Sequence, residues 1–196
     1  MEYNPKKKEI ILDKKLNDLD NFVIKFLRIL EKYVEYVIIS GYVSILLGRT
    51  RATEDIDVFI KPLSKDKFSK LYDELKKNDF WCINAEKINE IFNYLESGYA
   101  VRFAKNRFGT PNFEVKFPKD NLDEETFENF ITVILPSAKI KISSLERQIA
   151  FKKYYLSSDK DFEDALHIEN FFKKQINYTK IEEFKILIKK RQNEKK

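Results

Sequence analysis

Hydrophobic and polar residues follow two different periods along this chain, and each period predicts a different kind of element. Apolar residues recur with the helical period over residues 17–33, 65–78 and 87–95. Runs rich in β-branched and aromatic residues predict strands over residues 34–39, 55–60, 81–83, 99–104, 112–117, 131–135 and 138–142. The mixture predicts an α+β chain in which a small mixed β-sheet is flanked by helices.

The pattern changes near residue 140, from strand-rich to helical sequence. A helix is predicted from Ser144, and Ser157, Ser158 and Asp159 precede a second one. We therefore predict two parts. Residues 1–140 contain the sheet and the candidate catalytic residues, and residues 141–196 form a helical C-terminal region with a basic tail.

The central feature of the first part is the segment 34–60, which reads as strand, tight turn, short helix, loop and strand. Ser40 and Gly41 form the turn, where small residues let the backbone bend sharply and approach a ligand. Gly48 is the expected end of the short helix. Backbone N–H groups at such a turn, together with the N-terminus of the next helix, can bind phosphate.

Two acids begin the last strand of this segment. Side chains alternate along a strand, so Asp55 and Asp57 share one face. Neighbouring carboxylates repel each other, and a divalent cation removes that conflict; oxygen ligands suit magnesium. The alternative is a pair of solvated acids at the start of an edge strand, which is the more common origin of an isolated Asp-x-Asp.

The same segment resembles the signature of the nucleotidyltransferase superfamily: a hydrophobic strand, Gly-Gly or Gly-Ser, a spacer, and Asp-hydrophobic-Asp. Here 13 residues separate Gly41 from Asp55. The approach through Arg51 and Thr53 to Asp55 is most similar to the AbiEii-type toxin branch and its relatives. One departure is Ser40, which stands where these relatives usually carry glycine and which makes the turn less free.

The resemblance implies a nucleotidyltransferase fold with a nucleotide in the cleft before the helical region. It implies that Mg²⁺ or Mn²⁺ is held by Asp55, Asp57 and a third carboxylate. Glu114, on the polar face of strand 112–117, takes the third place, although such an acid can also be merely solvated; Asp120 and Asp161 are the next candidates. Residues implied to bind the nucleotide are Ser40, Gly41, Arg51, Thr53, Lys152, Lys160, Asp161 and Asp164.

The last four of these residues lie on the helical half, where the resemblance implies that they face the nucleotide. Their alternative role is a salt-bridged helix surface, for instance through a pair between Lys160 and Asp164. His167 lies in a Phe- and Leu-rich helix, and we expect it to serve packing rather than catalysis.

Composition sets limits on the class of protein. A chain of 196 residues with 43% hydrophobic residues can bury a sizeable core. The single Cys82 excludes an internal disulfide and a Cys-rich zinc site, and the single His167 excludes His-pair metal motifs. With no signal peptide and no apolar run of membrane-spanning length, we expect a soluble cytoplasmic protein with no membrane partner.

Positive charge is concentrated at the C-terminal end. The chain carries a net charge of +5, while residues 173–196 hold nine Lys and Arg against three Glu. Such a tail can attract nucleic acid by neutralising phosphates. A Lys-rich end is more often a solvated feature that aids solubility.

These observations predict a magnesium-dependent nucleotidyltransferase that moves a nucleoside monophosphate from an NTP to a hydroxyl of RNA, protein or a small molecule. The AbiEii-type resemblance adds a role as the toxin of a toxin–antitoxin pair, with a cognate antitoxin as partner. The main alternative is a non-catalytic nucleotide- or RNA-binding module that keeps the fold. A third interpretation is a module that only binds a protein partner.

Overall fold

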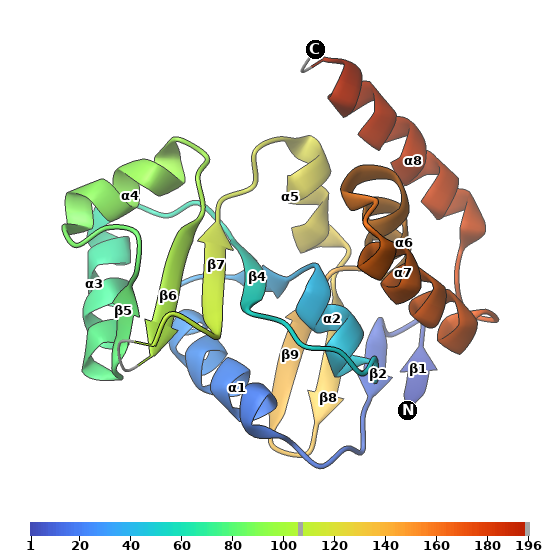
Figure 1. Ribbon diagram of the computed structural model, residues 1–196, viewed down its shortest axis with the longest axis horizontal. Coiled ribbons are helices and arrows are strands. Elements are labelled where there is room, and N and C mark those ends of the chain that lie inside the picture. The colour runs from blue at the N-terminus through green and yellow to red at the C-terminus, as the bar shows by residue number, and fades with distance from the viewer. Residues whose placement is uncertain (106–107, 195–196) are drawn as a thin grey trace.

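The computed structural model describes residues 1–105 and 108–194 (Figure 1). The strands are β1 (Glu2–Asn4), β2 (Glu9–Ile11), β3 (Tyr36–Ile38), β4 (Asp55–Ile60), β5 (Phe80–Cys82), β6 (Val101–Lys105), β7 (Asn112–Lys116), β8 (Ile131–Leu135) and β9 (Ala138–Ile142). The helices are α1 (Asp18–Leu30), α2 (Gly41–Leu46), α3 (Lys65–Lys77), α4 (Ile88–Glu96), α5 (Asn121–Glu128), α6 (Leu145–Phe151), the π-helix η1 (Lys152–Leu156), α7 (Asp159–Phe172) and α8 (Tyr178–Asn193).

The strands form one mixed sheet. Within the described ranges its order is β1-β2-β8-β9-β3-β4-β7-β6-β5. β4 runs parallel to β7 and antiparallel to β3, so the two strands predicted to carry acids are direct neighbours. The α+β fold with a mixed sheet and flanking helices is confirmed. The sheet is wider than expected because β1 and β2, three residues each, are too short to show a period and extend it beside β8.

Aromatic packing decides which way the central strands face. Phe113 of β7 stacks on Phe26 of α1, with ring centroids 3.8 Å apart and planes 7° from parallel. Phe22 and Phe80 join the same cluster. Because side chains alternate along a strand, burying Phe113 against α1 directs Glu114 to the opposite face. The core therefore sets the orientation of the predicted acid.

Local sequence explains the ends of the main helices. Asn17 caps α1 in a capping box with Asp20, and Ser64 and Ser158 accept hydrogen bonds at the starts of α3 and α7. Gly48 adopts a φ of 98° just after α2, which suits glycine at a helix end. Each of these boundaries confirms a predicted start or stop.

Helices α6, α7 and α8 pack together after the last strand, and α7 also contacts α2 (Figure 1). Most of the segment expected as a basic tail is α8, a regular helix whose Ile181, Phe184 and Ile188 are buried. The predicted division near residue 140 stays a prediction; Ile140 itself lies in β9, and the helices begin at Leu145. None of the helices in the described part of the chain is both long and apolar enough to cross a membrane.

Candidate active site

Three acids share one face of strands β4 and β7. The register places Asp57 directly beside Glu114, and Asp55 beside Asn112. Residues paired in this way point to the same side of a sheet, and Asp55 is two residues from Asp57 on that side. All three acids are partly exposed, while Ile56 is buried on the other face. The acids that the sequence predicts are thus neighbours on one open surface.

Two of these acids are paired with basic side chains. Lys116 Nζ lies 2.8 Å from Asp57 Oδ1, and Arg102 Nε donates to Glu114 Oε1 at 2.8 Å. The hydrogen bond from Arg102 to Glu114 raises the pKa of the guanidinium. Two adjacent carboxylates are therefore compatible with the fold because each has its own cation.

The donor set fits a divalent cation in its chemistry, since carboxylate oxygens are the ligands that magnesium prefers. In the ranges 1–105 and 108–194, no group of three or more His, Cys, Asp or Glu is arranged to hold a metal ion. A cation at this face would compete with Lys116 for Asp57 and with Arg102 for Glu114.

The turn before α2 has the geometry of a close approach. Ser40 has φ 64° and ψ −138°, a conformation that favours glycine. A Cβ at Gly41 would lie 2.0 Å from Arg51 Nη2, so the glycine lets the guanidinium of Arg51 lie over the turn. Thr53 Oγ1 donates to the carbonyl of Asp55 at 2.9 Å, which ties the same loop to β4. Four residues that the resemblance implies to bind the nucleotide, Ser40, Gly41, Arg51 and Thr53, are thus brought together.

The predicted residues of the helical half form a buried ion network. Asp164 is fully buried, and Lys152 Nζ lies 2.8 Å from its Oδ2 and 3.4 Å from Asp161 Oδ1. Arg51 Nε lies 3.5 Å from Asp164 Oδ2, so α7 holds the loop that covers the Ser40–Gly41 turn. Lys160 is exposed and stands apart from this network. The alternative role, a surface pair between Lys160 and Asp164, is not found among the described residues, because Asp164 is buried and pairs with Lys152.

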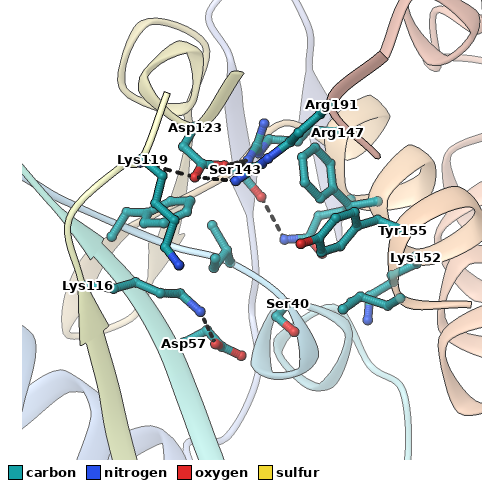
Figure 2. Close-up of a pocket in the computed structure, with 15 residues that line it drawn as sticks. Ser40, Asp57, Lys116, Lys119, Asp123, Ser143, Arg147, Lys152, Tyr155 and Arg191 are labelled. Carbon is teal, nitrogen blue, oxygen red and sulfur yellow. Dashed lines mark hydrogen bonds and ion pairs between the residues drawn. The ribbon is translucent and has the colours of Figure 1, made fainter. Parts of the chain in front are cut away.

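A pocket of about 190 Å³ lies between the β4–β7 face and the C-terminal helices (Figure 2). Of the predicted site residues, Ser40, Asp57 and Lys152 line it. The other predicted site residues lie outside its lining: Gly41, Arg51, Thr53, Asp55, Glu114, Lys160, Asp161 and Asp164. Asp55 and Glu114 share the face of Asp57, and Asp161 and Asp164 contact Lys152. Lining residues that the sequence did not single out include Lys116, Lys119, Asp123, Arg147, Tyr155 and Arg191.

Asp123 organises the far wall of this pocket. Its Oδ1 lies 3.1 Å from Arg147 Nη2 and 3.0 Å from Arg191 Nη1, and its Oδ2 accepts from Arg191 Nη2 at 3.1 Å. Burial opposes the ionisation of Asp123, but hydrogen bonding and charge from Arg191, with the charge of Arg147, outweigh burial and lower its pKa. Arg191 also bonds Asp120, at 3.0 Å, so α8 is joined to the start of α5.

One signal could have located α5. Asp120 is an N-cap residue, and Asp123 and Glu124 follow in the first turn, which is a recognisable helix start. No spacing rule predicts that Arg147 and Arg191 converge on Asp123, because α6 and α8 meet α5 only in the folded chain. His167 Nε2 lies 3.1 Å from the carbonyl oxygen of Leu47, a contact between α7 and the end of α2.

Comparison with solved structures identifies the class of fold. No protein-family model matches this sequence, and a search of curated proteins finds no match. The fold is similar to an antigenic nucleotidyltransferase-like protein from Paracoccidioides brasiliensis, with 18% identity over 88% of each chain and a TM-score of 0.52.

The solution structure of the antibiotic-resistance factor ANT(2'')-Ia is also similar. It shares 13% identity over 88% of this chain and 92% of that chain, with a TM-score of 0.57. The crystal structure of ANT(2'')-Ia in complex with adenylyl-2''-tobramycin gives 12% identity, coverage of 87% and 97%, and a TM-score of 0.51. The chain therefore has a nucleotidyltransferase-like fold, and at these identities the likeness describes the fold alone.

Proposed function

We propose that this protein is a metal-dependent nucleotidyltransferase that transfers a nucleoside monophosphate from an NTP to a hydroxyl acceptor. The observation that carries the proposal is the face formed by Asp55, Asp57 and Glu114, of which Asp57 lines the cationic pocket. Its fold is similar to that of nucleotidyltransferase-like proteins. ANT(2'')-Ia has been crystallised with adenylyl-2''-tobramycin, a nucleotidylated product.

Acids in a phosphate pocket favour an enzyme over a simple binder. A binder gains from cations, whereas carboxylates beside a triphosphate repel it unless a metal ion intervenes. In this proposal Asp55, Asp57 and Glu114 would hold Mg²⁺ or Mn²⁺, which when bound supplies charge neutralisation and a lower pKa for the acceptor hydroxyl. The three acids then have a reason to lie on the face that borders the pocket.

The remaining residues bind and orient the nucleotide. The backbone at Ser40 and Gly41 would donate to phosphate oxygens, and Arg51, lying over Gly41, would add positive charge. Lys152 lines the pocket, while Asp161 and Asp164 fix its ammonium group. Thr53 positions the loop through the Asp55 carbonyl. Lys160 is exposed on α7 and would contact only a substrate that extends beyond the pocket.

The reaction balances without a further co-reactant. The acceptor oxygen attacks the α-phosphorus, a new P–O bond forms, and the bond between the α-phosphorus and the bridging oxygen breaks, so pyrophosphate leaves. The hydroxyl proton passes to a carboxylate, for which Glu114 is the candidate once it has left Arg102. The acceptor class in this proposal is RNA, protein or a small molecule.

One observation favours the second candidate function, a non-catalytic nucleotide- or RNA-binding module. Lys116 and Arg102 neutralise Asp57 and Glu114 within the chain itself, so the fold does not need a metal ion at this face. The AbiEii-type resemblance of the segment from Arg51 to Asp57 supports the narrower proposal of a toxin with a cognate antitoxin. In this narrower proposal the toxin acts through the proposed nucleotidyl transfer.

Pyrophosphate release tests the proposal without knowledge of the acceptor. The protein is incubated with magnesium, each NTP in turn and an extract of total cell RNA and protein, and pyrophosphate is measured. We expect release by the wild type and none by Asp57→Asn. Asp66→Asn, an exposed acid in the first turn of α3, is the matched control and should behave like the wild type. Nucleotide binding without pyrophosphate release from any NTP would favour the non-catalytic module.

A further inference from the structure

Two lysines follow one another where β7 leaves the sheet. Lys116 is the last residue of β7 and shares the face of Glu114, and Lys119 follows three residues later. Both line the pocket, and Figure 2 shows both side chains directed into it. Neither was predicted from the sequence as a site residue.

Two features of the fold place Lys119 next to Asp123 and Gly98. Its backbone N–H donates to Asp123 Oδ2 at 3.2 Å. Its side chain passes over Gly98, where an added Cβ would lie 3.4 Å from Lys119 Cε. Gly98 has a φ of 76°, a conformation that favours glycine, so a larger residue there would be strained as well as close to the Lys119 stem.

The cations of the pocket differ in how firmly they are engaged. Arg147 and Arg191 are held by Asp123, and Lys152 is held by Asp161 and Asp164. Among the residues that the structure describes, Lys119 has no ion-pair partner. Lys116 is paired, but its partner Asp57 is one of the acids proposed to bind a metal ion.

Lys116 contacts Asp57 through Oδ1, so a divalent cation bound to this carboxylate competes with the Lys116 ammonium. The side chains of Lys116 and Asp57 are only 23% and 17% exposed, so either charge left alone would lose much of its solvation. If a metal ion took the place of Lys116 on Asp57, the Lys116 ammonium would need another anion nearby. The polyphosphate of an NTP is such an anion, and Lys119 stands beside the same cavity.

We propose that Lys116 exchanges partners during substrate binding, and that Lys116 and Lys119 together form the polyphosphate subsite. Without ligand, Lys116 neutralises Asp57. With a divalent cation on Asp57, the Lys116 ammonium moves to the polyphosphate, where Lys119 adds a second charge. This inference rests on the proposed function and adds to it the groups that hold the leaving pyrophosphate.

If Lys116 exchanges partners, its removal should have opposite effects on the affinities for a divalent cation and for polyphosphate. Removing the Lys116 ammonium should strengthen binding of Mn²⁺ alone, because the internal competitor for Asp57 is gone. The same change should weaken binding of inorganic tripolyphosphate with Mg²⁺ by about ten-fold, as expected for loss of one charge-assisted hydrogen bond. A residue that only supports the fold would lower both affinities together.

The test uses the full chain and two probes. Mn²⁺ binding is followed by the electron paramagnetic resonance of free Mn²⁺, and tripolyphosphate binding with Mg²⁺ by titration calorimetry. The variants are Lys116→Met and Lys119→Met, with Lys116→Gln as a polar replacement in case the methionine variant does not fold. Lys70→Met, an exposed lysine of α3, is the matched control. We expect Lys119→Met to weaken tripolyphosphate binding and leave Mn²⁺ binding unchanged.

The outcomes separate this inference from the proposed function. If the wild type binds Mn²⁺ and tripolyphosphate, with Mn²⁺ binding dependent on Asp57, but the lysine variants match Lys70→Met, the inference is overturned and the proposed function stands. If folded Lys116→Met and Lys116→Gln lose affinity for both probes, the exchange is overturned. If the wild type binds neither probe, both the inference and the proposed function fail.

Discussion

Asp57 and Glu114 lie side by side on the parallel strands β4 and β7, and each is neutralised by a basic residue on a neighbouring strand. Lys116 of β7 reaches Asp57, and Arg102 of β6, the direct cross-strand partner of Glu114, reaches Glu114. Acidic and basic side chains therefore lie next to one another on this face of the sheet. Its acids are neighbours, and in the proposed function a metal ion would compete with its cations for them.

The first prediction concerns ligand-dependent stability. Magnesium with NTP should stabilise the wild type by about 2.7 kcal/mol when ligand is present at about 100 times its dissociation constant. Asp57→Asn should lose most of this gain because it removes a carboxylate that binds the cation. Thermal melts with and without magnesium and NTP measure it, with Asp66→Asn as the control. Equal shifts in the wild type and Asp57→Asn would rule out Asp57 as a metal ligand.

A second prediction concerns the backbone at Ser40. Its φ of 64° with ψ of −138° is one that glycine adopts readily and serine does not. Ser40→Gly should therefore stabilise the protein by about 1 kcal/mol, because the relief of backbone strain exceeds the entropy that glycine adds to the unfolded chain. Urea unfolding at pH 7 measures the change. A clear loss of stability would show that the Ser40 side chain itself is needed by the turn.

The third prediction is a pH dependence centred on Asp123. Its pKa is lowered in the folded protein by Arg191 and Arg147, against the effect of burial. A carboxyl whose folded pKa lies below its unfolded value of about 3.9 stabilises the fold above that value. The contribution is lost as pH falls through the lowered pKa. Below that point the protonated acid no longer favours folding.

Asp123→Asn should accordingly cost about 3–5 kcal/mol at pH 7, because it leaves two largely buried guanidinium groups without their shared anion. The cost should shrink as pH falls below about 4. Urea unfolding of wild type and variant at pH 7 and pH 3 compares the two. Asp73→Asn, at an exposed position of α3, is the control and should change little at either pH. A cost that is independent of pH would argue against an ionised Asp123.

A fourth prediction concerns RNA binding by the basic end of the chain. Deleting residues 189–196 would also remove Arg191, which joins α8 to Asp120 and Asp123. The double variant Lys189→Ala, Lys190→Ala changes exposed lysines and leaves Arg191 in place. If the tail assists RNA binding, this variant should bind RNA more weakly and with a salt dependence flatter by about one per lost phosphate contact. An unchanged salt slope would leave these lysines a role in solubility.

Much of the fold could be predicted because its signals are local. The helix starts at Asn17, Ser64 and Ser158 follow from the chemistry of N-caps, and alternation along residues 55–60 and 112–117 gives the correct faces of β4 and β7. The same alternation was enough to place Asp55, Asp57 and Glu114 on one kind of surface. The pairing of Asp57 with Glu114 could not be predicted, because it depends on β4 and β7 being neighbours in the sheet.

The unpredicted parts depend on contacts between distant segments. β1 and β2 are three residues each and exist by pairing with one another and with β8. Arg191 reads as one more basic residue of a charged tail until α8 folds back and sets it against Asp123. The pairing of Lys116 with Asp57 likewise joins residues on different strands. These features arise from tertiary structure, which periodicity does not encode.

The most direct test of the account is transfer of label from NTP to an acceptor. Wild-type protein is incubated with magnesium and total cell RNA and protein, using NTP labelled on either the α- or the γ-phosphate. We predict that α-label enters an acceptor and γ-label does not, that Asp55→Ala and Asp57→Ala each abolish transfer, and that Glu114→Gln reduces it strongly. A silent Glu114→Gln would move the third-acid assignment to Asp120 or Asp161. Transfer that persists in Asp55→Ala and Asp57→Ala, or bound nucleotide with no α-label transferred by the wild type, would contradict the central claim.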